Sequence, residues 1–198
     1  MKPVKMCFGT GLTLLAAVAL IGCAPSQQTQ FYTLSGVETA EELSTDGRMR
    51  LGVGPVYLPA YLDRPQVVTR SGANRMNVSE ADQWAEPLET TFQRVLSENL
   101  SNRLSTDRIA TLPARRDVPL DHQVEVEVTR FDADETGKIV LDARWRIFDG
   151  RGDRLLHRGR AVTEERVATT GNYEQIAAAM SRCLAAMSDD VAEALLAH

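Results

Sequence analysis

Three stretches of alternating residues in the second half of the chain constrain the fold most. In residues 122–131, HQVEVEVTRF, the apolar Val124, Val126 and Val128 alternate with charged neighbours, which predicts a strand with one face in water. Residues 138–149, KIVLDARWRIFD, place Leu141, Ala143, Trp145 and Ile147 on one face. The turns DADETG and DGRGD join these stretches to each other and to RLLHRGRAVTEE. Together they predict a three-stranded antiparallel meander.

Two other segments change to a helical period. After Pro87, which suits the first turn of a helix, apolar residues recur every three or four positions: Leu88, Phe92, Val95, Leu96, Leu100 and Leu104. Near the end, Asn172 and Gln175 resemble a capping box ahead of a second apolar stripe. That stripe consists of Ile176, Met180, Cys183, Leu184, Met187, Val191 and Leu195. We therefore expect two amphipathic helices.

Shorter strands are expected in the first half of the chain. They cover residues 31–34, 48–59 with Pro55 at an edge or bulge, two extended pieces around a turn at 72–74, and 109–112. Two helices and at least five strands, some wet on one face, predict an α+β fold. We expect a single domain whose mostly antiparallel sheet has both amphipathic helices packed on one face.

The N-terminal residues have the pattern of a secretory signal peptide. Lys2 and Lys5 precede an apolar body at residues 8–21, and Gly22 stands before Cys23. As a helix this body would be roughly 21 Å long, shorter than a hydrocarbon core of about 30 Å, so a stable span is not expected. The residues LIGC at 20–23 resemble the bacterial lipobox, whose cysteine is acylated and becomes the first residue. The alternative is an ordinary cysteine beside an ordinary cleavage site.

These residues predict three parts: a signal peptide at 1–22, a lipidated Cys23 and tether at 23–30, and a folded domain at 31–198. Anchoring by two or three acyl chains is stable. Ala24 stands where an Asp would favour the inner membrane, so we expect outer-membrane lipid to hold the protein, facing the periplasm. The eight residues from Cys23 to Phe31 span at most about 29 Å, so an inner-membrane partner would have to reach the domain.

Charge and cysteine content exclude several classes of protein. Without Lys2 and Lys5, 20 basic residues face 27 acidic ones, a balance of −7, so no basic surplus exists to hold nucleic acid. Cys7 leaves with the signal peptide and Cys23 is acylated, which leaves Cys183 alone and predicts no internal disulfide. Cys183 lies on the helical stripe and is expected to be a buried small hydrophobe, not a nucleophile.

No catalytic or metal-binding pattern is found. His122, His157 and His198 lack metal-ligand spacing, and the chain has neither HExxH nor GxSxG. Gly52 and Gly54 precede Pro55 and not a helix, which argues against a phosphate loop. The acidic residues Asp132, Asp134 and Glu135 lack the spacing of a calcium loop, so we expect a solvated hairpin tip. We predict no enzyme activity, no metal and no cofactor.

One region departs from plain packing. Residues 57–70, YLPAYLDRPQVVTR, and 82–88, DQWAEPL, place apolar and aromatic side chains near arginine in expected loops, as partner-binding surfaces do. The candidate partner-binding residues are Tyr57, Leu58, Tyr61, Leu62, Arg64 and Trp84. The alternative is that they fold back as a lid on the core.

The same residues carry a family resemblance. The RPQVV and WAEPL elements, together with FYTL behind a lipobox, resemble the PqiC/YmbA family of outer-membrane lipoproteins over nearly the whole mature chain. The resemblance implies a non-enzymatic auxiliary component of an ABC-type intermembrane lipid-transport system whose central subunit is an MCE-domain protein of the PqiB type. It implies that the protein docks this subunit at the outer membrane, as a homo-oligomeric ring, and supports envelope integrity.

Two other functions are kept beside this one. The first is a structural or assembly lipoprotein that assists an outer-membrane protein without a transport role. The second is an enzyme acting on periplasmic substrates, which the missing catalytic pattern disfavours.

Overall fold

The structure is a computed structural model and describes residues 28–37, 43, 47–114 and 118–197. Within these residues it contains eight strands, two α-helices and one short 3-10 helix. Their bounds are β1 Gln30–Tyr32, β2 Leu51–Tyr57, η2 Ala60–Leu62, β3 Gln66–Arg70, β4 Met76–Trp84, α2 Leu88–Arg103, β5 Ile109–Thr111, β6 His122–Asp134, β7 Lys138–Asp149, β8 Leu155–Arg166 and α3 Tyr173–Leu196. The predicted single-domain α+β fold is confirmed.

The meander forms the largest part of the sheet, as the alternation predicts. Strand β6 pairs antiparallel with β7, and β7 pairs antiparallel with β8. Strand β6 continues to Asp134, two residues beyond the start of the expected turn, because its pairing with β7 persists through Ala133 opposite Ile139.

The other edge of β6 is shared by two strands, so the sheet forks. Strand β2 pairs parallel with β6 from Leu51 opposite His122 to Tyr57 opposite Glu127. Strand β3 pairs parallel with the far end of β6, where Arg70 is opposite Asp134. One branch continues from β2 to β5 and the other from β3 through β4 to β1. The segment 58–65, which includes η2, crosses the fork and connects the two branches.

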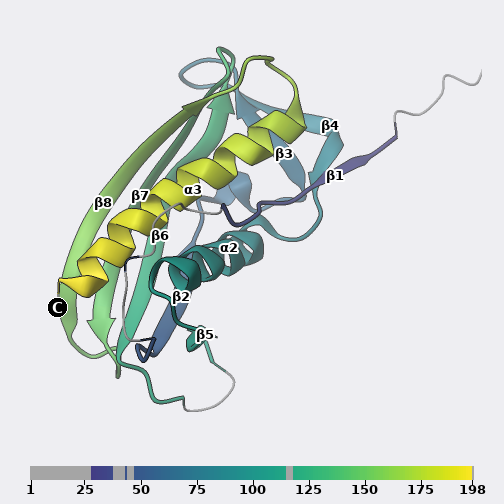
Figure 1. Ribbon diagram of the computed structural model, residues 1–198. Coiled ribbons are helices and arrows are strands. Elements are labelled where there is room, and N and C mark those ends of the chain that lie inside the picture. Colours follow the sequence, from purple (N-terminus) through teal and green to yellow (C-terminus); the bar gives the residue numbers. More distant parts are fainter. Residues whose placement is uncertain (1–27, 38–42, 44–46, 115–117, 198) are drawn as a thin grey trace, which may run out of the picture.

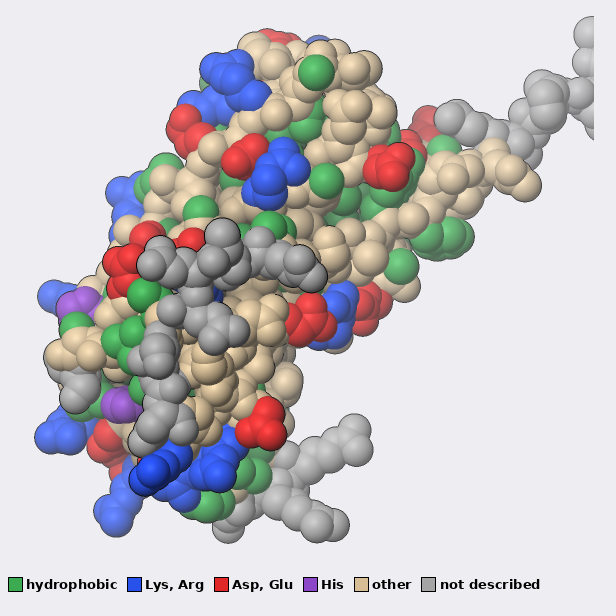
Figure 2. All heavy atoms as spheres, in the orientation of Figure 1, with side chains coloured by type: hydrophobic (Ala, Val, Ile, Leu, Met, Phe, Trp, Pro, Cys, Tyr) green, Lys and Arg blue, Asp and Glu red, His purple; other side chains and the backbone are tan. Residues whose placement is uncertain are grey.

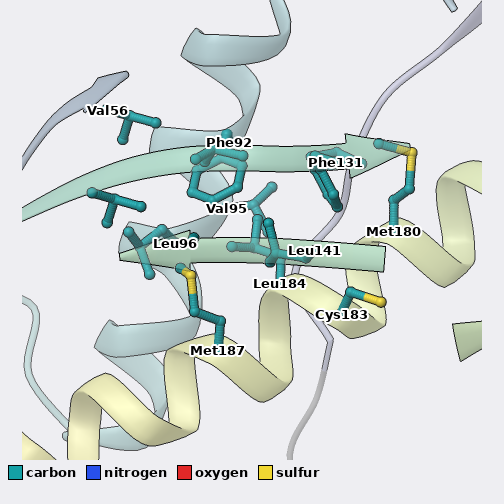
Figure 3. Close-up of a cluster of buried hydrophobic side chains, with 14 of the residues drawn as sticks. Val56, Phe92, Val95, Leu96, Phe131, Leu141, Met180, Cys183, Leu184 and Met187 are labelled. Carbon is teal, nitrogen blue, oxygen red and sulfur yellow. The ribbon is translucent and has the colours of Figure 1, made fainter. Parts of the chain in front are cut away.

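Both helices cover the same face of the sheet, as expected (Figure 1). Helix α2 packs on β2 and β5, α3 packs on β7 and β8, and the helices contact each other. Between helices and sheet, the Phe92 and Phe131 rings meet edge to face, with their centroids 5.7 Å apart. Figure 3 shows Leu141 and Leu184 in the same cluster of buried side chains, which makes up the core.

Several local predictions can be compared with the structure. Pro55 lies in an irregularity of β2, where the register with β6 shifts between Val53 and Val56. Pro87 is the N-cap of α2 and not a residue of its first turn. Asn172 caps α3 as predicted, since its Oδ1 accepts a hydrogen bond from the backbone N–H of Gln175 at 3.0 Å. Cys183 is a free, buried thiol, and burial raises its pKa to about 11.

The expected signal peptide, the acylated Cys23 and the tether up to residue 27 lie outside the described residues. Of the helices that the structure does describe, none combines the length and the apolar character that a membrane crossing would need.

Candidate functional site: a pocket beside the fork of the sheet

A pocket of about 640 Å³ lies between the 58–65 segment and the junction of β4 with α2. Its most buried walls are the side chains of Leu62, Trp84 and Leu88, which are each 5% exposed or less. The remaining lining is more accessible: Leu58, Ala60, Asp63, Arg64, Pro65, Ala85, Glu86, Pro87, Glu89 and Thr90. The pocket therefore combines apolar walls with a charged rim.

Backbone contacts bring the two walls together. The N–H of Trp84, at the end of β4, donates to the carbonyl of Pro65 at 2.7 Å. The N–H of Ala85 donates to the carbonyl of Tyr32 in β1 at 2.8 Å, and α2 begins immediately after Pro87. Both sides of the pocket are thus tied to strands of the β3–β4–β1 branch.

The rim carries more acidic than basic side chains. Asp63 and Glu89 are exposed, and Arg64 is the only basic residue of the described lining. Glu86 is ion-paired with Arg94 at 3.2 Å, and Arg94 also binds Glu98 at 2.9 Å. The rim of the pocket therefore carries a net negative charge.

Four of the six predicted partner-binding residues line this pocket: Leu58, Leu62, Arg64 and Trp84. The structure places Trp84 at the end of a strand, with Leu62 in η2, and not in open loops. Both Leu62 and Trp84 belong to the core cluster, while Leu58 packs against it. The two interpretations, a lid on the core and a binding surface, are therefore compatible, because the same side chains cover the core and line the pocket.

The two tyrosines lie elsewhere. Tyr57 is 54% exposed at the end of β2, opposite Glu127 of β6. The Tyr61 hydroxyl donates a hydrogen bond to the Asp132 carboxylate at 2.8 Å. Burial, followed by the charge of Asp132, raises the pKa of Tyr61 to about 12. Tyr61 thus connects the 58–65 segment, which forms one side of the pocket, to β6.

Asp132 was expected at a solvated hairpin tip, and this prediction is wrong. Its side chain is fully buried and accepts hydrogen bonds from Arg70 Nη2 at 3.1 Å and Arg130 Nε at 2.9 Å, besides that of Tyr61. Two of these donors come from 62 and 71 residues away in the chain. No local sequence signal indicates such a contact, since it depends on the fork of the sheet.

The pocket offers few kinds of reactive group. Its described lining contains no His, Cys, Ser or Lys, and its side-chain hydroxyl and carboxyl groups are those of Thr90, Asp63, Glu86 and Glu89. Over the described ranges, no group of three or more His, Cys, Asp and Glu residues could hold a metal ion. His157 stacks on the Trp145 ring, with 5.5 Å between the centroids. The class of protein defined here is a single-domain α+β protein with a surface pocket.

The chain belongs to the family of ABC-type transport auxiliary lipoprotein components, which matches residues 32–192. This family includes the PqiC/YmbA-type lipoproteins, so the resemblance seen in the sequence is confirmed. Membership indicates an auxiliary, membrane-associated lipoprotein with a partner in a transport system, and it favours a non-catalytic role.

Solved structures show the same fold. A crystal structure of an uncharacterized protein superposes with a TM-score of 0.68 at 21% identity, covering 85% of this chain and 99% of the other. A Xanthomonas campestris protein of the DUF330 family superposes with a TM-score of 0.70 at 14% identity, covering 83% and 93%. No curated protein matches this chain.

Proposed function

We propose that this protein is anchored in the outer membrane through acylated Cys23 and docks an MCE-domain, PqiB-type lipid-transport complex there. In this role it faces the periplasm as a homo-oligomeric ring and supports envelope integrity. Membership of the transport auxiliary family supports the role of an accessory subunit. The single observation that carries the choice of docking surface is the pocket between the 58–65 segment and the start of α2.

The pocket fits a peptide segment of the partner. Its walls offer Trp84 and Leu62 to an apolar side chain, and aromatic residues in such positions commonly dominate interface energies. The exposed Asp63 and Glu89 at the rim favour basic residues beside that side chain. The occupant that fits is therefore a short partner segment with an apolar anchor flanked by Lys or Arg.

Capture of the MCE partner from detergent-solubilised membranes tests this docking surface. Ala60→Trp fills the pocket mouth and Asp63→Lys reverses a rim charge, and both positions are exposed, so the fold should persist. We expect each variant to capture at least about fivefold less partner, a loss of about 1 kcal/mol of binding free energy. Ala73→Trp and Asp153→Lys make the same changes at exposed sites outside the pocket and should capture as much as wild type.

Undiminished capture by both pocket variants, with unchanged thermal unfolding, would remove the pocket from the proposal. Native mass spectrometry of the acylated protein in detergent tests the ring separately. A purely monomeric species at all concentrations would contradict that part.

A further inference from the structure

The face of the sheet opposite the helices carries a second feature. Contacts with α3 show which residues of β8 lie on which side: Thr163 Oγ1 donates to the Cys183 carbonyl, and Glu165 is paired with Arg182. Odd-numbered residues there face α3, so Arg158 and Arg160 point to the opposite face. In Figure 1 the helices lie in front of the strands, and this outer face is turned away from the viewer.

Four arginines form a compact cluster on the outer face. Across β7 and β8, Arg144 is directly opposite Arg160, and Arg146 is directly opposite Arg158. We call these four residues the arginine cluster. Like charges placed directly opposite each other on neighbouring strands destabilise a sheet. Two such pairs side by side therefore need anionic groups beside them.

Three carboxylates lie beside the four arginines, so the cluster keeps one positive charge without a counterpart. Arg146 binds Glu125 at 2.6 Å and Glu127 at 2.8 Å. Arg160 makes two hydrogen bonds to Asp142, at 2.8 and 2.7 Å, and these lower the pKa of that carboxyl group.

The other two arginines remain available. Arg144 and Arg158 are exposed and form no side-chain hydrogen bond or ion pair with the described part of the chain. They occupy diagonal positions on adjacent strands, which are about 7–8 Å apart in antiparallel sheets. Two guanidinium groups at this spacing can contact one phosphate or two adjacent ones.

The other face of the molecule is the side that the helices cover (Figure 1). On the side seen in Figure 1, acidic and basic side chains are interspersed among hydrophobic ones, as Figure 2 shows. The chain as a whole carries a formal charge of −5, so a surface with spare arginines stands out against an acidic background. Such a charge distribution orients a molecule in front of a negatively charged surface.

We propose that the arginine cluster binds the phosphate groups of anionic lipid, so that the outer face of the sheet lies on a membrane surface. Arginine forks match phosphate geometry. The same face presents Val162 and Tyr57, which are 52% and 54% exposed, and apolar side chains among cations are typical of surfaces that bind at the lipid interface. This orientation would turn α2 and α3 away from the bilayer.

A membrane surface is favoured over an acidic protein as the binding partner of the arginine cluster. The tether predicted from the sequence, eight residues from Cys23 to Phe31, would hold the domain within about 29 Å of a bilayer. Held this close, even a weak attraction to lipid would be populated. The inference goes beyond the docking role, because neither the pocket nor the MCE partner enters it.

The test uses the chain from residue 23 onward with Cys23→Ser, so that no acyl group contributes to binding. The core runs from Leu34 to Leu195 and is complete in this chain. Binding is measured by co-sedimentation with phosphatidylcholine vesicles that contain or lack phosphatidylglycerol. We expect binding only with phosphatidylglycerol, and its loss in about 0.5 M salt, which screens exposed charges.

The decisive variant is Arg144→Gln with Arg158→Gln. Each basic residue at an anionic surface contributes about a factor of five in binding, so the pair should weaken it roughly 10- to 30-fold. The matched control, Arg75→Gln with Arg108→Gln, removes the same charge at exposed positions outside the cluster and should bind like the parent chain.

Three results would overturn the proposal: equal loss in both double variants, equal binding to vesicles without phosphatidylglycerol, or no vesicle binding at all. If the Arg144→Gln and Arg158→Gln double variant binds vesicles as well as the parent chain but captures less MCE partner, the cluster binds an acidic protein surface. That result would also overturn the proposal. The pocket variants Ala60→Trp and Asp63→Lys should leave vesicle binding unchanged, so failure of this proposal and failure of the docking role give different results.

Discussion

At the scale of single residues, Asp132 connects the candidate site to the sheet. It is buried at the fork, where its carboxylate binds Tyr61 of the pocket segment, Arg70 of β3 and Arg130 of β6. Arg70 and Arg130 keep 24% and 30% of their side chains exposed, so water partly screens the cluster. The carboxylate still provides the charge that lets two arginines lie side by side here.

We predict that Asp132→Ala destabilises the protein by about 3 kcal/mol in urea unfolding, because it leaves two partly buried guanidinium groups without their acceptor. Tyr61→Phe removes one hydrogen bond to this carboxylate and keeps the ring, so it should cost less, about 1.5 kcal/mol. If the two substitutions cost the same, the charge of Asp132 is not what stabilises the fork.

At the scale of elements, the meander and the two helices could be predicted because their signals are local. Alternation fixes which face of β6 and β7 is buried, and a stripe at three- and four-residue spacing fixes the buried face of α2 and α3. The parallel pairings of β2 and β3 with β6 could not be predicted in this way. They join residues 64 to 71 positions apart in the chain, and nothing in either short strand specifies its neighbour.

The candidate site could likewise be predicted only in part. The sequence singled out residues 57–70 and 82–88, and the structure brings Leu58, Leu62, Arg64 and Trp84 from them to one pocket. The rim residues Asp63 and Glu89 were missed, because isolated acidic residues carry no signal until the fold places them beside apolar walls. Tyr61 is a neighbour of the binding residues in the sequence, but its hydroxyl donates to Asp132 on the β6 side.

The cap of α3 gives a prediction at this scale. Asn172 satisfies the backbone N–H of Gln175, and Ala cannot accept that hydrogen bond. Asn172→Ala should therefore lower the free energy of unfolding by about 1 kcal/mol, whereas Asn172→Asp should retain most of it, since Asp is an equally good cap. Chemical denaturation of the two variants side by side measures the difference, and equal stability of both would show that the cap contributes little.

At the scale of the whole molecule, the fold and the proposed anchor are separate. The core begins at Leu34, eleven residues after Cys23, so a change at Cys23 should alter where the protein resides without altering how it folds. The lipobox reading predicts two cysteines with opposite roles in the mature chain. Cys23 would hold the membrane through its acyl groups, while Cys183 only fills space in the core.

Fractionation of cells that express the full chain tests this division. Wild type and Cys183→Ala should both remain in the membrane pellet, and Cys23→Ser should be found in the soluble fraction, because it cannot carry the acyl chains that make anchoring stable. The pellets are washed in about 0.5 M salt before analysis, since contact of the arginine cluster with anionic lipid would otherwise retain part of the Cys23→Ser variant. If Cys23→Ser stays in the pellet after this wash, the proposal of an acyl anchor on Cys23 is wrong. If Cys183→Ala is released with an intact fold, Cys183 takes part in anchoring, and the roles given to the two cysteines are wrong.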